Sequence, residues 1–315
     1  MALRRSLVQV AHTLRQATAP EYETVGSRFA DGARSAATLA SVKSRIKSVQ
    51  NIKKITSAMK MVAASKMKRA QAQQEQAVGV PKPFLKLFGE ETTIPVRKTV
   101  NVPVSTDKGM CGGINTNIAK LTNACTVLDA EDAEKETRLM CVGSKGINPM
   151  KRLQGHRLDG ALTDYTKNKI TFATASAVSE EILKTEYDSV RLMYTSFKSA
   201  ISFKPTIATI LSPETLEKSE VIAEKLDQYE IEGPDRAELL HDMGEFQLAC
   251  MMYYAMNEAA TSEHASRMQA MENSTKNSSE MLEKLTLMYN RTRQAKVTTE
   301  LNEIISGALS LEDSG

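Results

Sequence analysis

The chain has 315 residues, which is enough for one large hydrophobic core or two modest ones. It carries 41 Lys and Arg against 38 Asp and Glu, so the net charge is only +3. Aromatic residues make up 5% with no Trp, while Met occurs 16 times. This composition disfavours a dense aromatic core and suits long helices that meet through Ala- and Met-rich surfaces.

The first 36 residues differ in character from the rest. Arg4, Arg5 and Arg15 stand among apolar residues at helical spacing, and no acid precedes Glu21. A basic, amphipathic segment without acids is typical of a mitochondrial transit peptide. An ordinary basic N-terminal helix is the alternative, so residues 1–36 are interpreted as a transit peptide or an N-terminal extension.

Two long segments lack both Gly and Pro, the residues that most often end helices. One has 46 residues between Gly32 and Gly79, and the other has 62 residues between Gly244 and Gly307. At 1.5 Å per residue these segments predict helices of about 70 Å and about 90 Å, which no compact domain of this mass would enclose.

Each segment carries an apolar stripe. The first has a period near 3.5, which predicts a left-handed coiled coil; it consists of Val42, Ile46, Val49, Ile52, Ile55, Met59 and Val62. The second is patchier and consists of Met268, Met271, Met281, Leu282, Leu285, Met288, Leu301, Ile304 and Ile305. Because the simplest partner for each stripe is the other helix, we expect an antiparallel pair.

Between these segments the periodicity becomes that of strands alternating with helices. Strands are predicted at residues 100–104, 138–143, 189–195 and 206–211, and helices at 114–128 and 171–185. Pro103 argues that its strand ends there or lies at a sheet edge. The predicted fold is therefore a small Rossmann-like α/β domain inserted between the two helices of a long antiparallel coiled coil.

The stretch STDKGMCGGIN, residues 105–115, lies where a phosphate-binding loop would lie, between a strand and a helix. It matches neither G-x-x-x-x-G-K-[ST] nor G-x-G-x-x-G, so we interpret it as a tight turn whose glycines let backbones approach. The four Cys and four His lack metal-ligand and nucleophile patterns. We expect reduced cysteines, no catalytic residue, no cofactor and no metal. No apolar run reaches the roughly 20 residues of a membrane-spanning helix.

Residues 36–74 contain nine Lys or Arg and no acid. A segment of one sign usually meets a partner of the other sign. Two interpretations give this segment a partner, either nucleic acid or a protein surface lined with carboxylates. In a third interpretation it has no partner and is a basic face exposed to solvent. The positive residues are spread around the helix and form no single groove-facing stripe, which argues against DNA.

Residues 37–71, 105–115 and 261–309 closely resemble the gamma subunit of F-type ATP synthase, the central rotor shaft of that complex. The resemblance implies a coiled coil inside a ring of three alpha and three beta subunits. It also implies an α/β domain beside a foot that rests, with the delta and epsilon subunits, on the membrane ring of c subunits. Such a chain is not an enzyme by itself; it couples proton-driven rotation to conformational cycling of the beta subunits during ATP synthesis.

The implied location is the matrix side of the mitochondrial inner membrane, as a peripheral subunit without nucleic acid. Two other classes of protein stay open at this point. One is a basic coiled-coil nucleic-acid-binding or scaffold protein, and the other is an α/β enzyme with a helical appendage. The implied domains are residues 37–90 for the first helix, 91–232 for the α/β domain and 233–315 for the second helix.

The resemblance also assigns partner contacts position by position. Met59, Arg293 and Gln294 match residues that face beta at the lower collar of the ring. Four basic residues would lie where acidic loops of beta pass: Lys60, Lys66, Lys68 and Arg69. An apolar sleeve at the top of the ring would hold Ile304, Ile305 and Leu309. Lys108 stands where the family usually has Arg, so a bidentate contact at that turn is not expected.

Overall fold

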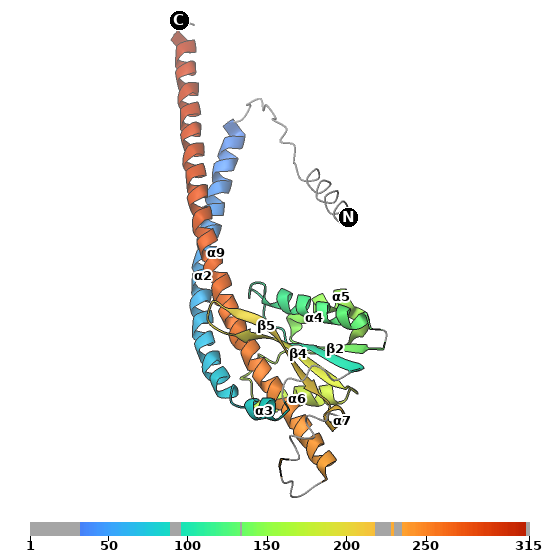
Figure 1. Ribbon diagram of the computed structural model, residues 1–315. Coiled ribbons are helices and arrows are strands. Elements are labelled where there is room, and N and C mark those ends of the chain that lie inside the picture. The colour runs from blue at the N-terminus through green and yellow to red at the C-terminus, as the bar shows by residue number, and fades with distance from the viewer. Residues whose placement is uncertain (1–31, 89–95, 133, 218–227, 230–234, 313–315) are drawn as a thin grey trace, which may run out of the picture. The chain divides into compact units, whose positions relative to one another are not determined.

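The computed structural model describes residues 32–88, 96–132, 134–217, 228–229 and 235–312 (Figure 1). Most of the predicted N-terminal extension, residues 1–31, lies outside these ranges. The chain divides into two compact units, Ile46–Lys284 on one side and Met1–Arg45 with Leu285–Gly315 on the other.

Two long helices dominate the secondary structure. Helix α2 (Gly32–Ala77) has 46 residues, and helix α9 (Arg236–Glu312) has 77. The length of α2 agrees with its Gly-free run, whereas α9 exceeds the prediction because it continues through Gly244 and Gly307. A Gly inside a helix costs only about 1 kcal/mol relative to Ala. At Gly244 the missing side chain has a packing reason, because a Cβ there would lie 2.8 Å from Cγ of Pro213.

The central sheet has five strands in the order β3-β2-β1-β4-β5. The strands are β1 (Lys98–Pro103), β2 (Glu136–Val142), β3 (Leu158–Leu162), β4 (Ser189–Phe197) and β5 (Phe203–Leu211). Strands β1 to β4 are parallel, and β5 pairs antiparallel with β4. This order is that of a doubly wound Rossmann-like half, and it confirms the predicted fold class.

Helices cover both faces of the sheet, as Figure 1 shows. On one face lie α4 (Ile114–Ala130) and α5 (Ser144–Gln154), which meet β2 through a small cluster of Ala119, Cys141 and Met150. On the other face lie α6 (Phe172–Leu183) and residues 248–260 of α9, which bury the main core. Helix α9 is thus a core helix of the α/β domain as well as a helix of the long pair.

Shorter elements complete the described chain. They are α3 (Lys82–Phe88), α7 (Pro213–Glu217) and a 3-10 turn at Gly155–Arg157. Phe88 of α3 and Leu216 of α7 share a second core cluster with Leu240 of α9. This cluster ties the connection after α2 to the beginning of α9.

The predicted strands and helices of the middle domain all occur, with ends shifted by a few residues. Pro103 is the last residue of β1, so the strand-end alternative is right; the edge alternative is wrong, because β1 is the middle strand of the sheet. Four described elements of the middle domain went unpredicted: α5, β3, the five-residue α7 and the 3-10 turn. Helix α5 contains Gly146 and Pro149, and the five-residue strand β3 contains Gly160, so both have weak local signals.

Candidate functional site

Helix α2 pairs with α9 through residues 46–77. Three side-chain contacts join the helices: Thr56 with Thr275, Lys60 with Glu272, and Gln74 with Glu258. Residue numbers rise along α2 as their partners' numbers fall along α9, so the helices are antiparallel. The structure therefore confirms the predicted pairing.

The contact surface of α2 repeats every seven residues. Val49, Thr56, Ala63 and Ala77 fall on this repeat and are buried. A repeat of seven is the spacing of a left-handed coiled coil. After Val49 the buried side chains on this repeat are small or polar.

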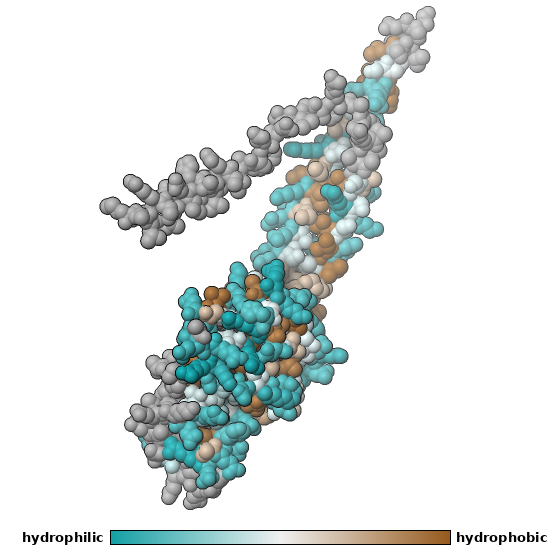
Figure 2. Space-filling view, turned by 90° about the vertical axis from the view of Figure 1, so that its right-hand side faces the viewer, coloured by the Kyte–Doolittle hydropathy of each residue, from teal (hydrophilic) through white to brown (hydrophobic). Residues whose placement is uncertain are grey.

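The apolar stripe predicted for α2 is wrong beyond Val49. Ile52, Ile55 and Val62 are 48%, 56% and 56% exposed, and Met59 is 36% exposed. At 100° per residue Ile55 lies about 120° around the helix from Val49, so both cannot face α9. These side chains belong to an outward-facing apolar surface, and Figure 2 shows hydrophobic side chains between hydrophilic ones along the paired helices.

The basic residues of α2 differ in their surroundings. Lys60 lies 3.2 Å from Glu272, Nζ to Oε1, and both side chains are 40% exposed. Lys66, Lys68 and Arg69 are exposed. Within the described part of the chain these three residues have no ion-pair partner. The structure thus separates one internally paired lysine from three charges that face solvent.

The remaining predicted contacts lie on residues 285–312 of α9, in the second unit. Arg293 and Gln294 are exposed on this helix. Ile304, Ile305 and Leu309 are also exposed, and such apolar residues over the last turns form an unburied surface. The predicted site residues are therefore all accessible, apart from the half-buried Lys60.

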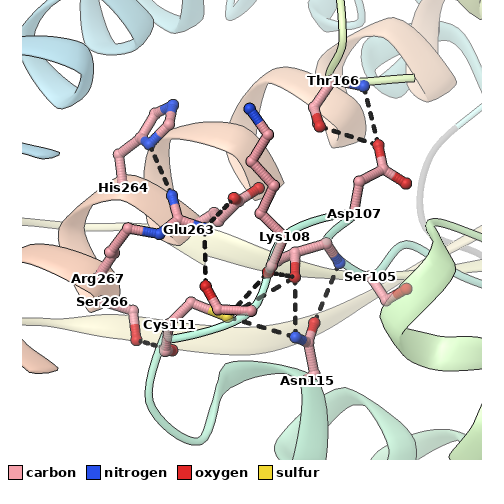
Figure 3. Close-up of polar contacts among 12 residues, drawn as sticks. Ser105, Asp107, Lys108, Cys111, Asn115, Thr166, Glu263, His264, Ser266 and Arg267 are labelled. Atoms are coloured by element: carbon pink, nitrogen blue, oxygen red, sulfur yellow. Dashed lines mark hydrogen bonds and ion pairs between the residues drawn. The ribbon is translucent and has the colours of Figure 1, made fainter. Parts of the chain in front are cut away.

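The glycine-rich turn between β1 and α4 is held by its own side chains (Figure 3). The Thr106 hydroxyl donates to the Lys108 carbonyl over 2.7 Å, and Asn115 both accepts from the Thr106 N–H and donates to its hydroxyl. Asp107 accepts from the backbone N–H groups of three residues and from one hydroxyl: Ser144, Asp164 and Thr166. The polar groups of the turn are thus directed at the protein, which confirms its interpretation as a structural turn.

A buried polar cluster of α9 packs against this turn (Figure 3). The Ser266 hydroxyl donates to the Cys111 carbonyl, and Arg267 donates to the Gly109 carbonyl and to the Glu263 carboxylate over 2.5 Å. Gly112, at φ +62°, brings its backbone so close that a Cβ would lie 3.1 Å from Ser266 Oγ. The sequence resemblance identified the turn but gave no sign of this docking.

Burial controls the charges in that cluster. It raises the pKa of Glu263, although the hydrogen bond and charge of Arg267 act in the opposite direction. It lowers the pKa of His264 to about 4, and the positive charges of Arg267, Lys66 and Lys108 contribute to the shift. His264 is therefore neutral at physiological pH.

The described residues contain no group of three or more His, Cys, Asp or Glu placed to hold a metal ion. Among the described helices, none has an apolar stretch long enough to cross a membrane. All four cysteines are free, and three of them are buried.

Comparisons with known proteins agree with this architecture. The family described as ATP synthase matches residues 38–311. The mitochondrial ATP synthase subunit gamma of Arabidopsis thaliana is 46% identical over 276 residues, covering 86% of this chain and 85% of the relative. The gamma subunit of the mitochondrial ATP synthase F(1) complex of Rattus norvegicus is 38% identical, covering 88% of this chain and all of the relative.

Solved structures give the same result. A chain from the central stalk and c-ring structure of the Tetrahymena thermophila mitochondrial ATP synthase is 28% identical, with a TM-score of 0.57, and the match covers 70% of this chain and 98% of that one. A chain of the Euglena gracilis mitochondrial ATP synthase is 20% identical with a TM-score of 0.76, and the match covers 89% of this chain and 96% of that one. This second match supports the fold. The chain therefore belongs to the ATP synthase family, among its gamma subunits.

Proposed function

We propose that this chain is the central rotor shaft of a mitochondrial ATP synthase. It is a non-catalytic subunit that couples proton-driven rotation of the c-ring to conformational cycling of the catalytic beta subunits. The observation that carries the proposal is the antiparallel pairing of α2 with α9, in which α9 is also a core helix of the α/β domain. A force on that domain reaches the paired helices through one continuous helix.

The work of such a subunit is mechanical. A proton that crosses the membrane supplies about 2.3 kcal/mol per 100 mV, and the rotor carries that energy as torque. A shaft can shift the equilibrium between the open and closed forms of a beta subunit only by the difference in its contact free energy with those two forms. Two unequal helices show a different side to each of three surrounding beta subunits, and this asymmetry provides the difference.

The basic side chains of α2 suit a moving contact with carboxylates. Lys66, Lys68 and Arg69 are exposed. Ion pairs in solvent are worth about 0 to 1 kcal/mol each, so a rotating helix exchanges them without being locked to one partner. Lys60 takes part less freely because Glu272 already engages it. Met59 adds a pliable apolar contact.

The rest of α9 supplies the other contacts with the ring. Arg293 and Gln294 are assigned to the beta subunits at its lower collar. Ile304, Ile305 and Leu309 are assigned to an apolar sleeve at its top, where non-directional apolar contact permits rotation. Exposure of all five residues supports these assignments.

The α/β domain lies beside the foot of the shaft in this proposal. The partners of the foot are the delta and epsilon subunits and the c-ring, and these contacts place the chain peripherally on the matrix side of the inner membrane. We assign residues 37–90 and 233–315 to the shaft and residues 91–232 to the α/β domain. The mitochondrial relatives support this location, and nothing in the comparisons supports a nucleic-acid-binding protein.

Native mass spectrometry tests the proposal. The chain, carrying an affinity tag, is expressed in cells that lack their own gamma subunit, and the complex it pulls down is weighed intact. We expect one copy of the chain with three alpha and three beta subunits. Recovery of the chain alone, or with nucleic acid that dissociates as salt is raised, would contradict it.

A further inference from the structure

Glu258 is a buried carboxylate at the junction of three elements. It lies on α9 and is 1% exposed. Its Oε1 accepts a hydrogen bond from Gln74 Nε2 on α2 over 2.7 Å, and its Oε2 accepts one from the backbone N–H of Phe197, at the end of β4, over 2.5 Å. One side chain thus bonds both to the partner helix and to the sheet.

A third donor lies on α9 itself. Tyr254, one turn before Glu258, hydrogen-bonds to the carboxylate; burial, and then the charge and hydrogen bond of Glu258, raise the pKa of the Tyr254 hydroxyl. The donors around Glu258 in the described structure are therefore neutral groups. Burying a carboxylate without a cation is costly, and it persists only where directional hydrogen bonds offset the loss of water.

The neighbouring contacts explain why a directional bond is useful here. The contact surface of α2 carries Ala63 and Ala77, whose apolar contacts have little directional preference. The Ser262 hydroxyl donates to the Thr195 carbonyl, so α9 has a second bond to β4, but α2 is joined to this region by Gln74. Thr56 with Thr275 and Lys60 with Glu272 also join the two helices, but farther along the seam, and neither pair bonds to the described strands of the sheet. A polar pair in a coiled-coil seam is the best attested device for fixing helix register.

We propose that Glu258 is a positioning residue for torque transfer: it holds α2 in register on α9 and joins both helices to the end of β4. Rotation of the α/β domain then moves the two helices as one body. Without the bond, α2 slips along α9 under load, and part of the rotation is lost before it reaches the catalytic ring. This inference rests on the proposed function as a rotor shaft.

The central variant is Glu258→Gln, which keeps the shape of the side chain. Glutamine keeps one acceptor oxygen for the Phe197 N–H and turns its NH2 group to Gln74. The Gln74 amide can rotate so that its own oxygen accepts from this group, but the new bond is between neutral groups, so the charge-assisted bond to α2 is lost. ATP synthase assembled with this chain in place of its resident gamma subunit is reconstituted in vesicles. We expect ATP hydrolysis to continue while protons pumped per ATP fall by about tenfold, the effect of losing one charge-assisted hydrogen bond.

The double variant Gln74→Glu with Glu258→Gln provides the rescue. The new amide at position 258 accepts from the Phe197 N–H and donates to the new carboxylate at position 74, so both bonds return with their polarity exchanged. We expect pumping per ATP to recover. A merely structural effect of the single change would lower the amount of complex and leave the pumping ratio of the assembled complex unchanged.

A second single variant covers the case in which Glu258→Gln does not assemble. Gln74→Leu removes the link from α2 and leaves the Phe197 bond, and it should lower the same ratio. Gln71→Leu is the matched control, because Gln71 bonds to Glu75 on its own helix, and it should pump normally.

The unmodified chain separates the two possible failures. If it does not assemble or pump, the proposed function fails. If it pumps and Glu258→Gln or Gln74→Leu pumps equally well per ATP, or if the double variant stays as defective as Glu258→Gln, the positioning role is refuted.

Discussion

Lys60 of α2 and Glu272 of α9 lie 3.2 Å apart and form an ion pair between the two long helices. Among the described residues it is the one ion pair that joins them. The lysine was predicted to meet acidic loops of a partner, yet it already has an acid within its own chain. Its contribution to the paired helices can therefore be measured separately from any contact with other subunits.

The first prediction concerns that pair. Lys60→Glu should lower the free energy of unfolding of the full chain by about 0.5 to 1 kcal/mol, because two half-exposed carboxylates would face each other. Reversing both charges, Lys60→Glu with Glu272→Lys, should restore most of the loss. Urea unfolding measures both, and the difference should shrink in high salt. Lys68→Glu is the control, because Lys68 is exposed, and an equal loss there would argue against a specific pair.

The second prediction concerns the contact of α9 with beta. Arg293→Glu should reduce ATP-driven rotation and ATP synthesis by about tenfold, the scale of reversing one interfacial charge, because it would repel carboxylates on beta. Nucleotide affinity of isolated beta should not change. Arg291→Glu is a matched reversal about 160° around the same helix and should have a smaller effect. Full coupled synthesis by the Arg293 variant would contradict the assigned contact.

The third prediction concerns pH. The pKa of His264 is lowered to about 4 in the folded chain, against 6.5 when unfolded. Between these values the unfolded chain binds more protons, so stability is lost as pH falls from 6.5 towards 4. We expect a loss of roughly 1 to 2 kcal/mol after allowance for solvent screening.

His264→Gln tests this contribution. The variant should lose less stability than the wild-type chain when urea unfolding at pH 7 is compared with unfolding at pH 5. Other titrating groups, Glu263 among them, are common to both proteins and cancel in the difference. Identical pH profiles would show that His264 is protonated as easily in the folded chain as in water.

The fourth prediction concerns Gly143, between β2 and α5. Its φ is +95°, and a Cβ would lie 2.2 Å from the Ser105 carbonyl oxygen. Gly143→Ala should therefore cost about 3 kcal/mol or more in unfolding free energy, since both backbone strain and a backbone clash oppose it. Gly155→Ala is the control, because no atom lies within 4 Å of its Cβ position. A small effect at Gly143 would show that the strand-to-helix turns can move apart.

The amino-acid sequence by itself determined the elements of this protein. The Gly-free runs predicted two long helices, alternation predicted four of the five strands, and the ordered match over residues 37–71 and 261–309 identified the family. These signals are local, because helix and strand periods are properties of neighbouring residues. The elements α5 and β3 were missed for the same reason, since Gly and Pro weaken the local pattern there.

Only the tertiary structure decided which side of each helix packs against another element and which side faces solvent. Periodicity suggested that Ile52, Ile55 and Met59 face α9, whereas Thr56 and Ala63 do so and the larger side chains are exposed. The bonds from Gln74 to Glu258 and from Arg267 to Gly109 join residues more than 150 positions apart. Such pairs depend on the register of two helices and on the close backbone approach that Gly112 permits. Those are properties of packing, which no short stretch of sequence contains.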